Sequence, residues 1–231
     1  MQRYFSNEIK NNVLTLSKED LYHINTVMRM KENDLIEVVF NNTLYICKLK
    51  NNTADIIEKK EELINTQPIY LVIPLLKEQK MDYILQKATE LNVDKIYPTI
   101  MERSVIKIND KADKKIIRWN KIVKEAAEQS KRLNIPTIEN IKTLKEITKL
   151  PGNIYVCSTK EKINNIKNIL NNNKSTEPLI FIIGPEGGIS PSEEDYLIEN
   201  KVTPISLGEN ILRAETAPLY ILSTIIYNNL K

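Results

Sequence analysis

The chain of 231 residues contains only five glycines, two cysteines and one histidine. Because Cys47 and Cys157 are few and far apart, we expect no disulfide framework and a reduced, cytoplasmic compartment. One histidine, His23, with two scattered cysteines argues against a zinc site and against a Ser-His-Asp hydrolase, so we predict no metal. No apolar run approaches the ~20 residues of a membrane span, and the N-terminus has no signal-peptide core. We therefore predict no membrane partner.

The composition is otherwise typical of a soluble globular protein, with 42% hydrophobic and 27% charged residues. The length allows one large domain or two small ones. The net charge of +3 is too small to identify a nucleic-acid binder by itself.

Residues 1–68 are predicted to be rich in β-strands. Short apolar or alternating runs at 13–16, 35–40, 44–49 and 54–57 are separated by Asn-rich turns. Ser17 and Asp20 resemble a capping box, and apolar residues follow at helical spacing, so we expect a helix over residues 18–29. His23 in this helix is expected to be a partly buried structural residue. Several short strands at regular spacing indicate a small barrel.

Residues 69–231 alternate between strand and helix patterns, which predicts an α/β domain with a mostly parallel sheet and helices on its faces. We expect strands at 69–76, 95–100, 137–141, 153–158, 179–183 and 203–207. Helices are expected around 81–91, 119–127 and 161–170, from Ser190-Pro191 onward, and over 217–229 with Thr216 as its cap. Cys157 and Trp119 are expected in the core.

Four of the five glycines lie between residues 184 and 208, in two loops that each lead from a predicted strand to a helix. The loops begin Gly184-Pro185-Glu186-Gly187-Gly188 and Leu207-Gly208. Ligands of open α/β sheets bind beyond the carboxyl ends of the strands, and glycine permits positive φ and close approach. Two tight turns would give the same pattern. Dinucleotide and P-loop signatures are absent, and Gly152 is expected in an ordinary turn.

A basic stretch lies between Arg103 and Arg132, where ten Lys and Arg residues stand against four acidic ones. Such a concentration is expected for contact with a phosphate backbone. A solvated helix face would explain part of it, since Lys121 and Lys124 are spaced to pair with Glu125 and Glu128.

The two glycine loops, with Ile211-Leu212-Arg213-Ala214-Glu215-Thr216-Ala217, resemble the signature of the RsmE family. These are 16S ribosomal RNA uridine N3-methyltransferases of the knotted SPOUT class. The similarity covers nearly the whole chain, with one departure at Lys131-Arg132, where the family often has a small residue before Arg. Further matching positions are Arg3-Tyr4-Phe5, His23, Arg29, Lys80-Met81, Gln86–Leu91, Glu102-Arg103-Ser104, Trp119, Glu125–Ser130 and Pro136.

The resemblance implies a PUA-like β-barrel that binds RNA over residues 1–68 and a SPOUT methyltransferase domain over residues 69–231. The C-terminal segment of that α/β domain would form a trefoil knot. It further implies a homodimer that uses S-adenosylmethionine, without a metal, to methylate N3 of uridine 1498 in 16S rRNA of the small ribosomal subunit.

The resemblance also implies roles for particular residues. Arg213 is expected to stabilise negative charge on the uracil, and Glu186 to accept its proton or orient it. Glu215 could do the same, but its position favours a role at a helix start. Cofactor contacts are expected from Ile183, Gly184, Pro185, Glu186, Gly187, Leu207, Gly208, Ile211, Leu212 and Thr216. RNA contacts are expected from Arg3, Arg29, Arg103 and Arg132.

Two other functions fit the sequence. One is a SPOUT methyltransferase with another RNA target, such as a tRNA ribose 2′-hydroxyl. The other is a non-catalytic assembly factor that binds ribosomal RNA.

Overall fold

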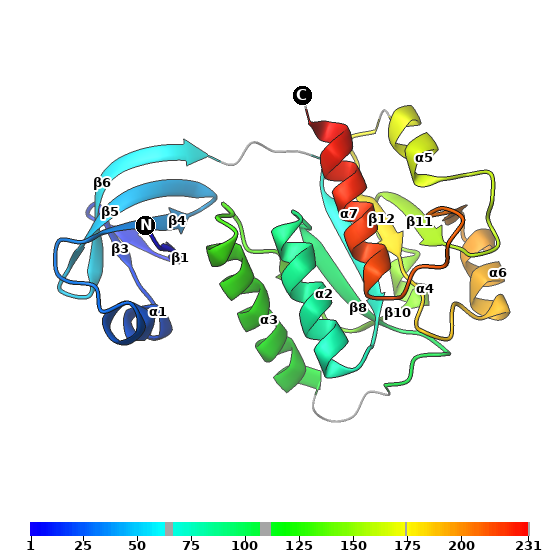
Figure 1. Cartoon of the computed structure of the whole chain (residues 1–231), viewed down its shortest axis with the longest axis horizontal. Helices are drawn as coiled ribbons and strands as arrows, with labels where there is room; N and C mark the ends of the chain where they lie inside the picture. Colours follow the sequence, from blue (N-terminus) through cyan, green and yellow to red (C-terminus); the bar gives the residue numbers. More distant parts are fainter. Residues whose placement is uncertain (63–66, 107–111, 174, 231) are drawn as a thin grey trace. The chain divides into compact units, whose positions relative to one another are not determined.

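The computed structural model describes residues 1–62, 67–106, 112–173 and 175–230 (Figure 1). The chain forms two compact units, one of residues 1–65 with 125–135 and one of residues 66–124 with 136–231. The long helix α3 (Ala112–Gln129) therefore contributes to both units. The division between residues 68 and 69, with a separate role for each domain, stays a prediction.

The first unit is built on a six-stranded mixed sheet in the order β1-β4-β5-β6-β3-β2. Only β1 runs parallel to its neighbour β4 among the paired strands described. Two register shifts between β5 and β6 increase the local twist, and the sheet is curled, as expected of the predicted barrel (Figure 1). The strands are β1 (Arg3–Phe5), β2 (Ile9–Lys10), β3 (Val13–Thr15), β4 (Leu35–Phe40), β5 (Thr43–Lys50) and β6 (Thr53–Glu62).

The predicted capping box starts the helix of this unit. The Ser17 hydroxyl accepts from the Asp20 N–H at 3.1 Å, and the Asp20 carboxylate accepts from the Ser17 N–H at 3.3 Å. The α-helix α1 (Lys18–Tyr22) then widens into a π-helical turn, η1 (His23–Val27). His23 is half-buried, as predicted, with Nδ1 at 3.0 Å from the hydroxyl of buried Tyr4, a contact that favours a structural role.

The second unit contains a parallel sheet in the order β10-β8-β7-β12-β11-β13, with β9 also paired to β8. All four residues of β12 are buried, as a strand covered on both faces requires. The strands are β7 (Ile69–Pro74), β8 (Lys95–Ile100), β9 (Thr137–Ile138), β10 (Lys142–Thr143), β11 (Asn153–Cys157), β12 (Leu179–Ile182) and β13 (Thr203–Ile205).

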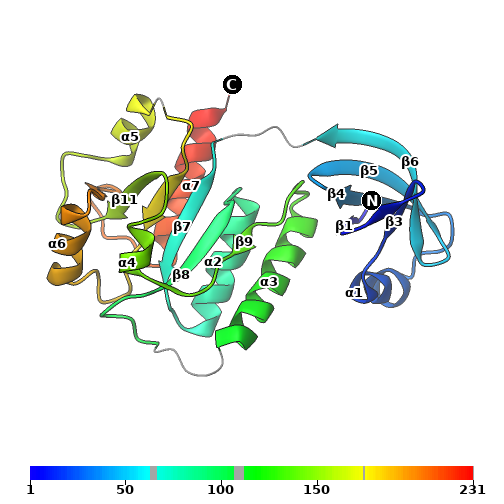
Figure 2. The same cartoon turned by 180° about the vertical axis from the view of Figure 1, so that it is seen from behind.

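Helices cover both faces of this sheet. Figures 1 and 2 show α2 and α7 on one face and α4 and α6 on the other, and α2 packs against α7. Trp119 of α3 is only 4% exposed, as predicted. Besides α3, the helices are α2 (Glu78–Glu90), α4 (Leu144–Ile147), α5 (Ile166–Asn172), α6 (Pro191–Glu199) and α7 (Thr216–Asn229).

Two predicted helix starts are wrong. The helix expected from residue 161 begins at Ile166, because the Glu161 carboxylate accepts hydrogen bonds from the N–H groups of residues 162–164 and Asn165 caps the helix. Thr216 is the first residue of α7 rather than its cap. The cap position is occupied by Glu215, whose side chain makes no capping hydrogen bond.

Gly152 is more constrained than the ordinary turn that we expect from its Pro151-Gly152 sequence. Its φ is +131°, and a Cβ there would lie 2.6 Å from the carbonyl oxygen of Pro178. The Asn153 N–H donates to that same carbonyl at 2.8 Å. A side chain would therefore disturb the start of the pairing between β11 and β12.

No helix in the described part of the chain is long and apolar enough to cross a membrane.

Candidate active site

The glycine loops meet at one cavity of about 690 Å³, at the carboxyl ends of the adjacent strands β12, β11 and β13. This is the place that a parallel sheet offers a ligand. Arg213 and nine of the ten residues expected to contact a cofactor line its wall; Thr216 is not among the lining residues described. The nine are Ile183, Gly184, Pro185, Glu186, Gly187, Leu207, Gly208, Ile211 and Leu212.

Glycine serves different purposes in the two loops. A Cβ on Gly184 would lie 2.9 Å from the Ile189 side chain, so the first loop is folded tightly on itself. Gly208 has a φ of +127° with open space around its Cα, so it is the conformation that requires glycine there. Both loops therefore bring bare backbone to the cavity wall.

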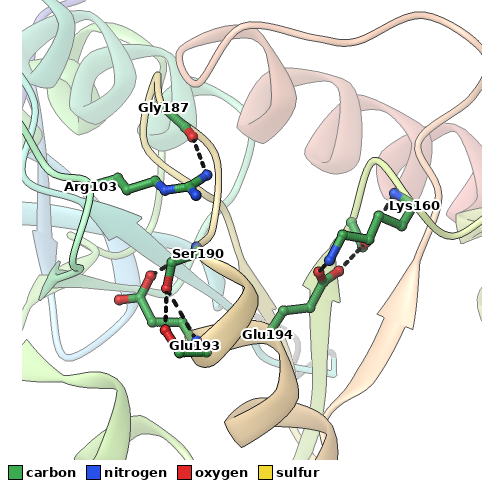
Figure 3. Close-up of polar contacts among 8 residues, drawn as sticks. Arg103, Lys160, Gly187, Ser190, Glu193 and Glu194 are labelled. Atoms are coloured by element: carbon green, nitrogen blue, oxygen red, sulfur yellow. Dashed lines mark hydrogen bonds and ion pairs between the residues drawn. The ribbon is translucent and has the colours of Figure 1, made fainter.

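A third segment of the wall, residues 157–160 at the end of β11 and just after it, was not predicted. Its polar groups converge on Glu194 of α6, which is only 7% exposed (Figure 3). The Ser158 hydroxyl donates to one Glu194 oxygen, and the Lys160 ammonium pairs with the other. Burial raises the pKa of Glu194, but the hydrogen bonds from Lys160 and Ser158 outweigh it and hold the pKa below its usual range.

Cys157 also belongs to this wall, rather than to the core as predicted. Its side chain is partly exposed and lines the cavity. Burial of the thiol raises its pKa to about 12.

The first glycine loop is anchored to the segment that follows β8 (Figure 3). The Arg103 guanidinium donates to the Gly187 carbonyl at 3.0 Å, and the Glu102 N–H donates to the Glu193 carboxylate at 2.7 Å. Glu193 in turn forms the predicted capping box with Ser190, which confirms the expected start of α6. The loop and the helix start are thus held together from the end of β8, two strands away from β12 in the sheet.

Lys80 of α2 joins the two glycine loops. Its ammonium lies 3.1 Å from a carboxylate oxygen of Glu186 and 3.1 Å from one of Glu215. The contact with Glu186 is a hydrogen bond, whereas the Glu215 oxygen is buried and not aligned for one. Glu186 and then Glu215 raise the pKa of Lys80. Glu215 therefore acts through Lys80 rather than as a side-chain cap.

The Glu215 carboxyl is held ionised. Burial raises its pKa, but its own backbone N–H, the Lys80 ammonium and the Arg213 guanidinium lower it more. Lys80 lies outside both glycine loops, so the local sequence pattern does not predict that it reaches this site. From the sequence, Lys80 is named only as a position that matches the RsmE family, without a role.

Arg213 belongs both to the cavity wall and to the start of α7. Its side chain is exposed at the cavity, while its carbonyl accepts from the N–H groups of Thr216 and Ala217 at the start of α7. Within the described residues, its guanidinium has no hydrogen-bond or ion-pair partner at contact distance. The backbone is fixed and the charged end is available to a substrate.

The four arginines expected to contact RNA do not share one environment. Arg103 lines the cavity of the second unit, and Arg29 is exposed in the first unit. Arg3 is 6% exposed, pairs with Glu37 at 2.8 Å and donates to the carbonyl of Arg132 at 3.2 Å. Arg132 is 7% exposed, and its guanidinium donates to Asn134. The burial of Arg3 and Arg132 favours structural roles for both.

Some residues of the basic stretch form ion pairs with acidic side chains of the same chain. Arg118 pairs with Glu78 at 3.0 Å and with Asp82, both on α2, and Lys131 pairs with Glu37 at 3.1 Å. Lys107 and Lys111 lie outside the described residues. Among those described, no group of three or more His, Cys, Asp or Glu residues is placed to hold a metal.

Comparison with known proteins agrees with this geometry. Residues 64–226 match the model of a family described as an RNA methyltransferase domain. Curated relatives named ribosomal RNA small subunit methyltransferase E are 33% identical in Bacillus subtilis, covering 98% of this chain and 96% of the relative, and 34% identical in Mesomycoplasma hyopneumoniae, covering 98% and 99%.

A solved structure extends the similarity to the fold. The ribosomal RNA small subunit methyltransferase E of Neisseria gonorrhoeae, bound to S-adenosyl methionine, has a TM-score of 0.86 and 27% identity over 98% of this chain and 97% of its own. The predicted fold class, a PUA-like barrel with a SPOUT α/β domain, is thereby confirmed. The chain belongs to the RsmE family of ribosomal RNA small subunit methyltransferases.

Proposed function

We propose that the protein transfers a methyl group from S-adenosylmethionine to N3 of a uridine, at position 1498, in 16S rRNA of the small ribosomal subunit. The observation that carries this proposal is the convergence of both glycine loops and Arg213 on one cavity. The target atom and nucleotide rest on the RsmE resemblance.

The cavity residues fit S-adenosylmethionine. A volume of about 690 Å³ lies within the range of small-molecule sites. The backbone of Gly184–Gly187, Leu207-Gly208 and Ile211-Leu212 would offer donors and acceptors at fixed positions, and Ile183, Leu207 and Leu212 would form apolar walls for an adenine. The carboxylate of Glu186, which lines the cavity, would complement the positive charge of a sulfonium. Thr216, although it is not among the described residues that line the cavity, would be a further cofactor contact.

When bound, S-adenosylmethionine supplies an electrophilic methyl group on a sulfonium. Uracil N3 carries a proton and its lone pair is delocalised, so the proton must be lost as the new N–C bond forms. We assign Arg213 to donate hydrogen bonds to uracil O2 or O4, where negative charge develops. Glu186 would accept the N3 proton or orient the base. The cavity also fixes the direction of approach, and good alignment alone can be worth ~7–11 kcal/mol.

The remaining assignments follow the domain boundary that the sequence predicts after residue 68. Residues 1–68 would bind RNA through the barrel, with Arg29 as the exposed arginine, and residues 69–231 would carry catalysis, with Arg103 beside the cavity. Arg3 and Arg132 would support RNA binding indirectly, by ordering the first unit. We also propose a homodimer, as the resemblance implies.

A labelled-methyl experiment tests the proposal. The protein is incubated with methyl-labelled S-adenosylmethionine and small ribosomal subunits from a strain that lacks it, with naked 16S RNA and bulk tRNA as parallel substrates. We expect label in the 16S RNA of the subunits. Label in tRNA alone would support the ribose 2′-hydroxyl alternative, and binding without any label would support the assembly factor.

A further inference from the structure

One ammonium group holds two carboxylates that come from different loops. Lys80 Nζ is 3.1 Å from an oxygen of Glu186 and 3.1 Å from an oxygen of Glu215. The two oxygens can therefore be no farther apart than twice that distance. The three side chains are only 31%, 33% and 17% exposed, so water screens this cluster less than it would at an open surface.

The cluster is built across three elements. Lys80 is in the first turn of α2, Glu186 is in the loop after β12, and Glu215 ends the loop after β13. Both of these loops, and Lys80 itself, line the cavity. The geometry of the cluster thus depends on the relative position of the two loops that would hold the cofactor.

We propose that Lys80 is a positioning residue that closes the cofactor cavity by binding both loops through Glu186 and Glu215. This inference rests on the proposed function, because the ligand of the cavity is taken to be S-adenosylmethionine. Lys80 is not assigned a contact with the reacting atoms. Its role is to neutralise two like charges that would otherwise push the loops apart.

The physical consequence depends on pH. Without the ammonium, two carboxylates remain close together in a poorly screened place, and like charges raise the pKa of at least one of them. Protonation would relieve the repulsion, so the loops should close at low pH and separate at high pH. With Lys80 present, its positive charge offsets the repulsion, so the loops can stay together without protonation of either carboxylate.

Other charged groups around the cluster do not substitute for Lys80. Arg213 is a further cation that acts electrostatically on Glu215, but the proposed mechanism requires it at the substrate. On α2, the acidic residues Glu78 and Asp82 are already paired with Arg118. Other titratable or charged residues on the facing elements include Lys77 at the cap of α2, Tyr83 on α2, Glu102 and Arg103 after β8, Glu209 after β13, and Tyr220 and Tyr227 on α7.

Calorimetric titration with S-adenosylmethionine between about pH 4.5 and pH 8.5 tests the proposal. The variants are Lys80→Met, Lys80→Arg and the double variant Lys80→Met with Glu215→Gln. Lys77→Met is the matched control, since it removes an exposed lysine at the same end of α2. Unfolding midpoints of the ligand-free variants are measured over the same pH range.

We expect Lys80→Met to weaken binding about tenfold or more at high pH, the effect of one moderate like-charge repulsion, and to approach wild type at low pH. The double variant should regain most of the affinity, while Lys80→Arg and Lys77→Met should stay near wild type. The ligand-free Lys80→Met protein should likewise lose stability as pH rises, and Glu215→Gln should remove that loss.

Three outcomes would overturn the proposal. Unchanged affinity and stability in Lys80→Met would show that the cluster does not position the loops. A loss that is equal at every pH and is not rescued by Glu215→Gln would mean that Lys80 contacts the ligand directly. A loss of folding in Lys80→Arg as well would mean a packing role. If wild type itself fails to bind S-adenosylmethionine, the proposed function fails, and the ligand-free stability comparison still decides the role of Lys80.

Discussion

At the scale of single residues, the account depends most on Arg213, whose guanidinium is available while its backbone is fixed. Loss of one preorganised donor of this kind costs ~2.7–4 kcal/mol in the transition state. We therefore expect Arg213→Ala to bind S-adenosylmethionine like wild type by calorimetry, while single-turnover methyl transfer falls about a hundredfold or more. Lys145→Ala, an exposed lysine on α4, is the control. Unchanged turnover would remove Arg213 from the mechanism.

The charge state of Glu194 should change the free energy of unfolding. Its pKa is lowered in the folded protein, so the stabilisation it provides is fully present above the unfolded value near 4.5 and is lost as pH falls through the folded value. We expect Glu194→Gln to reduce the free energy of unfolding by roughly 1–3 kcal/mol at neutral pH, because Ser158 and Lys160 lose a charged acceptor.

Urea unfolding of Glu194→Gln at about pH 7 and about pH 3.5 checks this, and the difference from wild type should shrink at the lower pH. Glu199→Gln changes an exposed carboxylate on the same helix and should have little effect at either pH. An equal loss for Glu194→Gln at both pH values would show that its role is packing rather than charge.

At the scale of elements, the start of α6 fixes where the first glycine loop ends. Ser190 is 2% exposed and accepts from the Glu193 N–H at 3.2 Å. Ser190→Ala should lower the free energy of unfolding by about 1 kcal/mol, the usual cost of losing a cap. The measurement is urea unfolding, with Ser223→Ala on the exposed side of α7 as control. Equal stability of the two variants would argue against a structural role for the cap.

Elements with strong local signals were predictable from the sequence, and those fixed by distant partners were not. The caps Ser17 and Ser190 and the apolar strand β12 follow from their own residues. By contrast, β1 has three residues and exists because it pairs with β4, more than thirty positions later. The start of α5 was missed because one carboxylate, Glu161, organises the preceding loop.

The same distinction applies to the site. The glycine loops were identifiable because glycine is scarce in this chain and strand-to-helix loops are where ligands bind. The segment 157–160 and Lys80 reach the cavity only through the strand order, which places β11 between β12 and β13 and α2 against α7. Strand order is a property of tertiary packing that local patterns do not encode. For the same reason, the burial of Arg3 against Glu37 could not be foreseen.

At the scale of the whole molecule, the proposed homodimer predicts a particle of about twice the 26.7 kDa chain mass. The exposed hydrophobic residues Tyr220 and Tyr227 on α7 and Ile211 in the cavity loop would suit a subunit interface. Sedimentation equilibrium at micromolar concentration should give that doubled mass. A single-chain mass across the whole concentration range would contradict the dimer.

The central claim is that this cavity directs methyl transfer to N3 of one uridine in 16S rRNA. Nucleoside analysis of 16S RNA from small subunits treated with the protein and S-adenosylmethionine tests it most directly. The account predicts N3-methyluridine with wild-type protein and its near absence with Arg213→Ala. A 2′-O-methylated nucleoside as the product, or no methylated product at all, would contradict it.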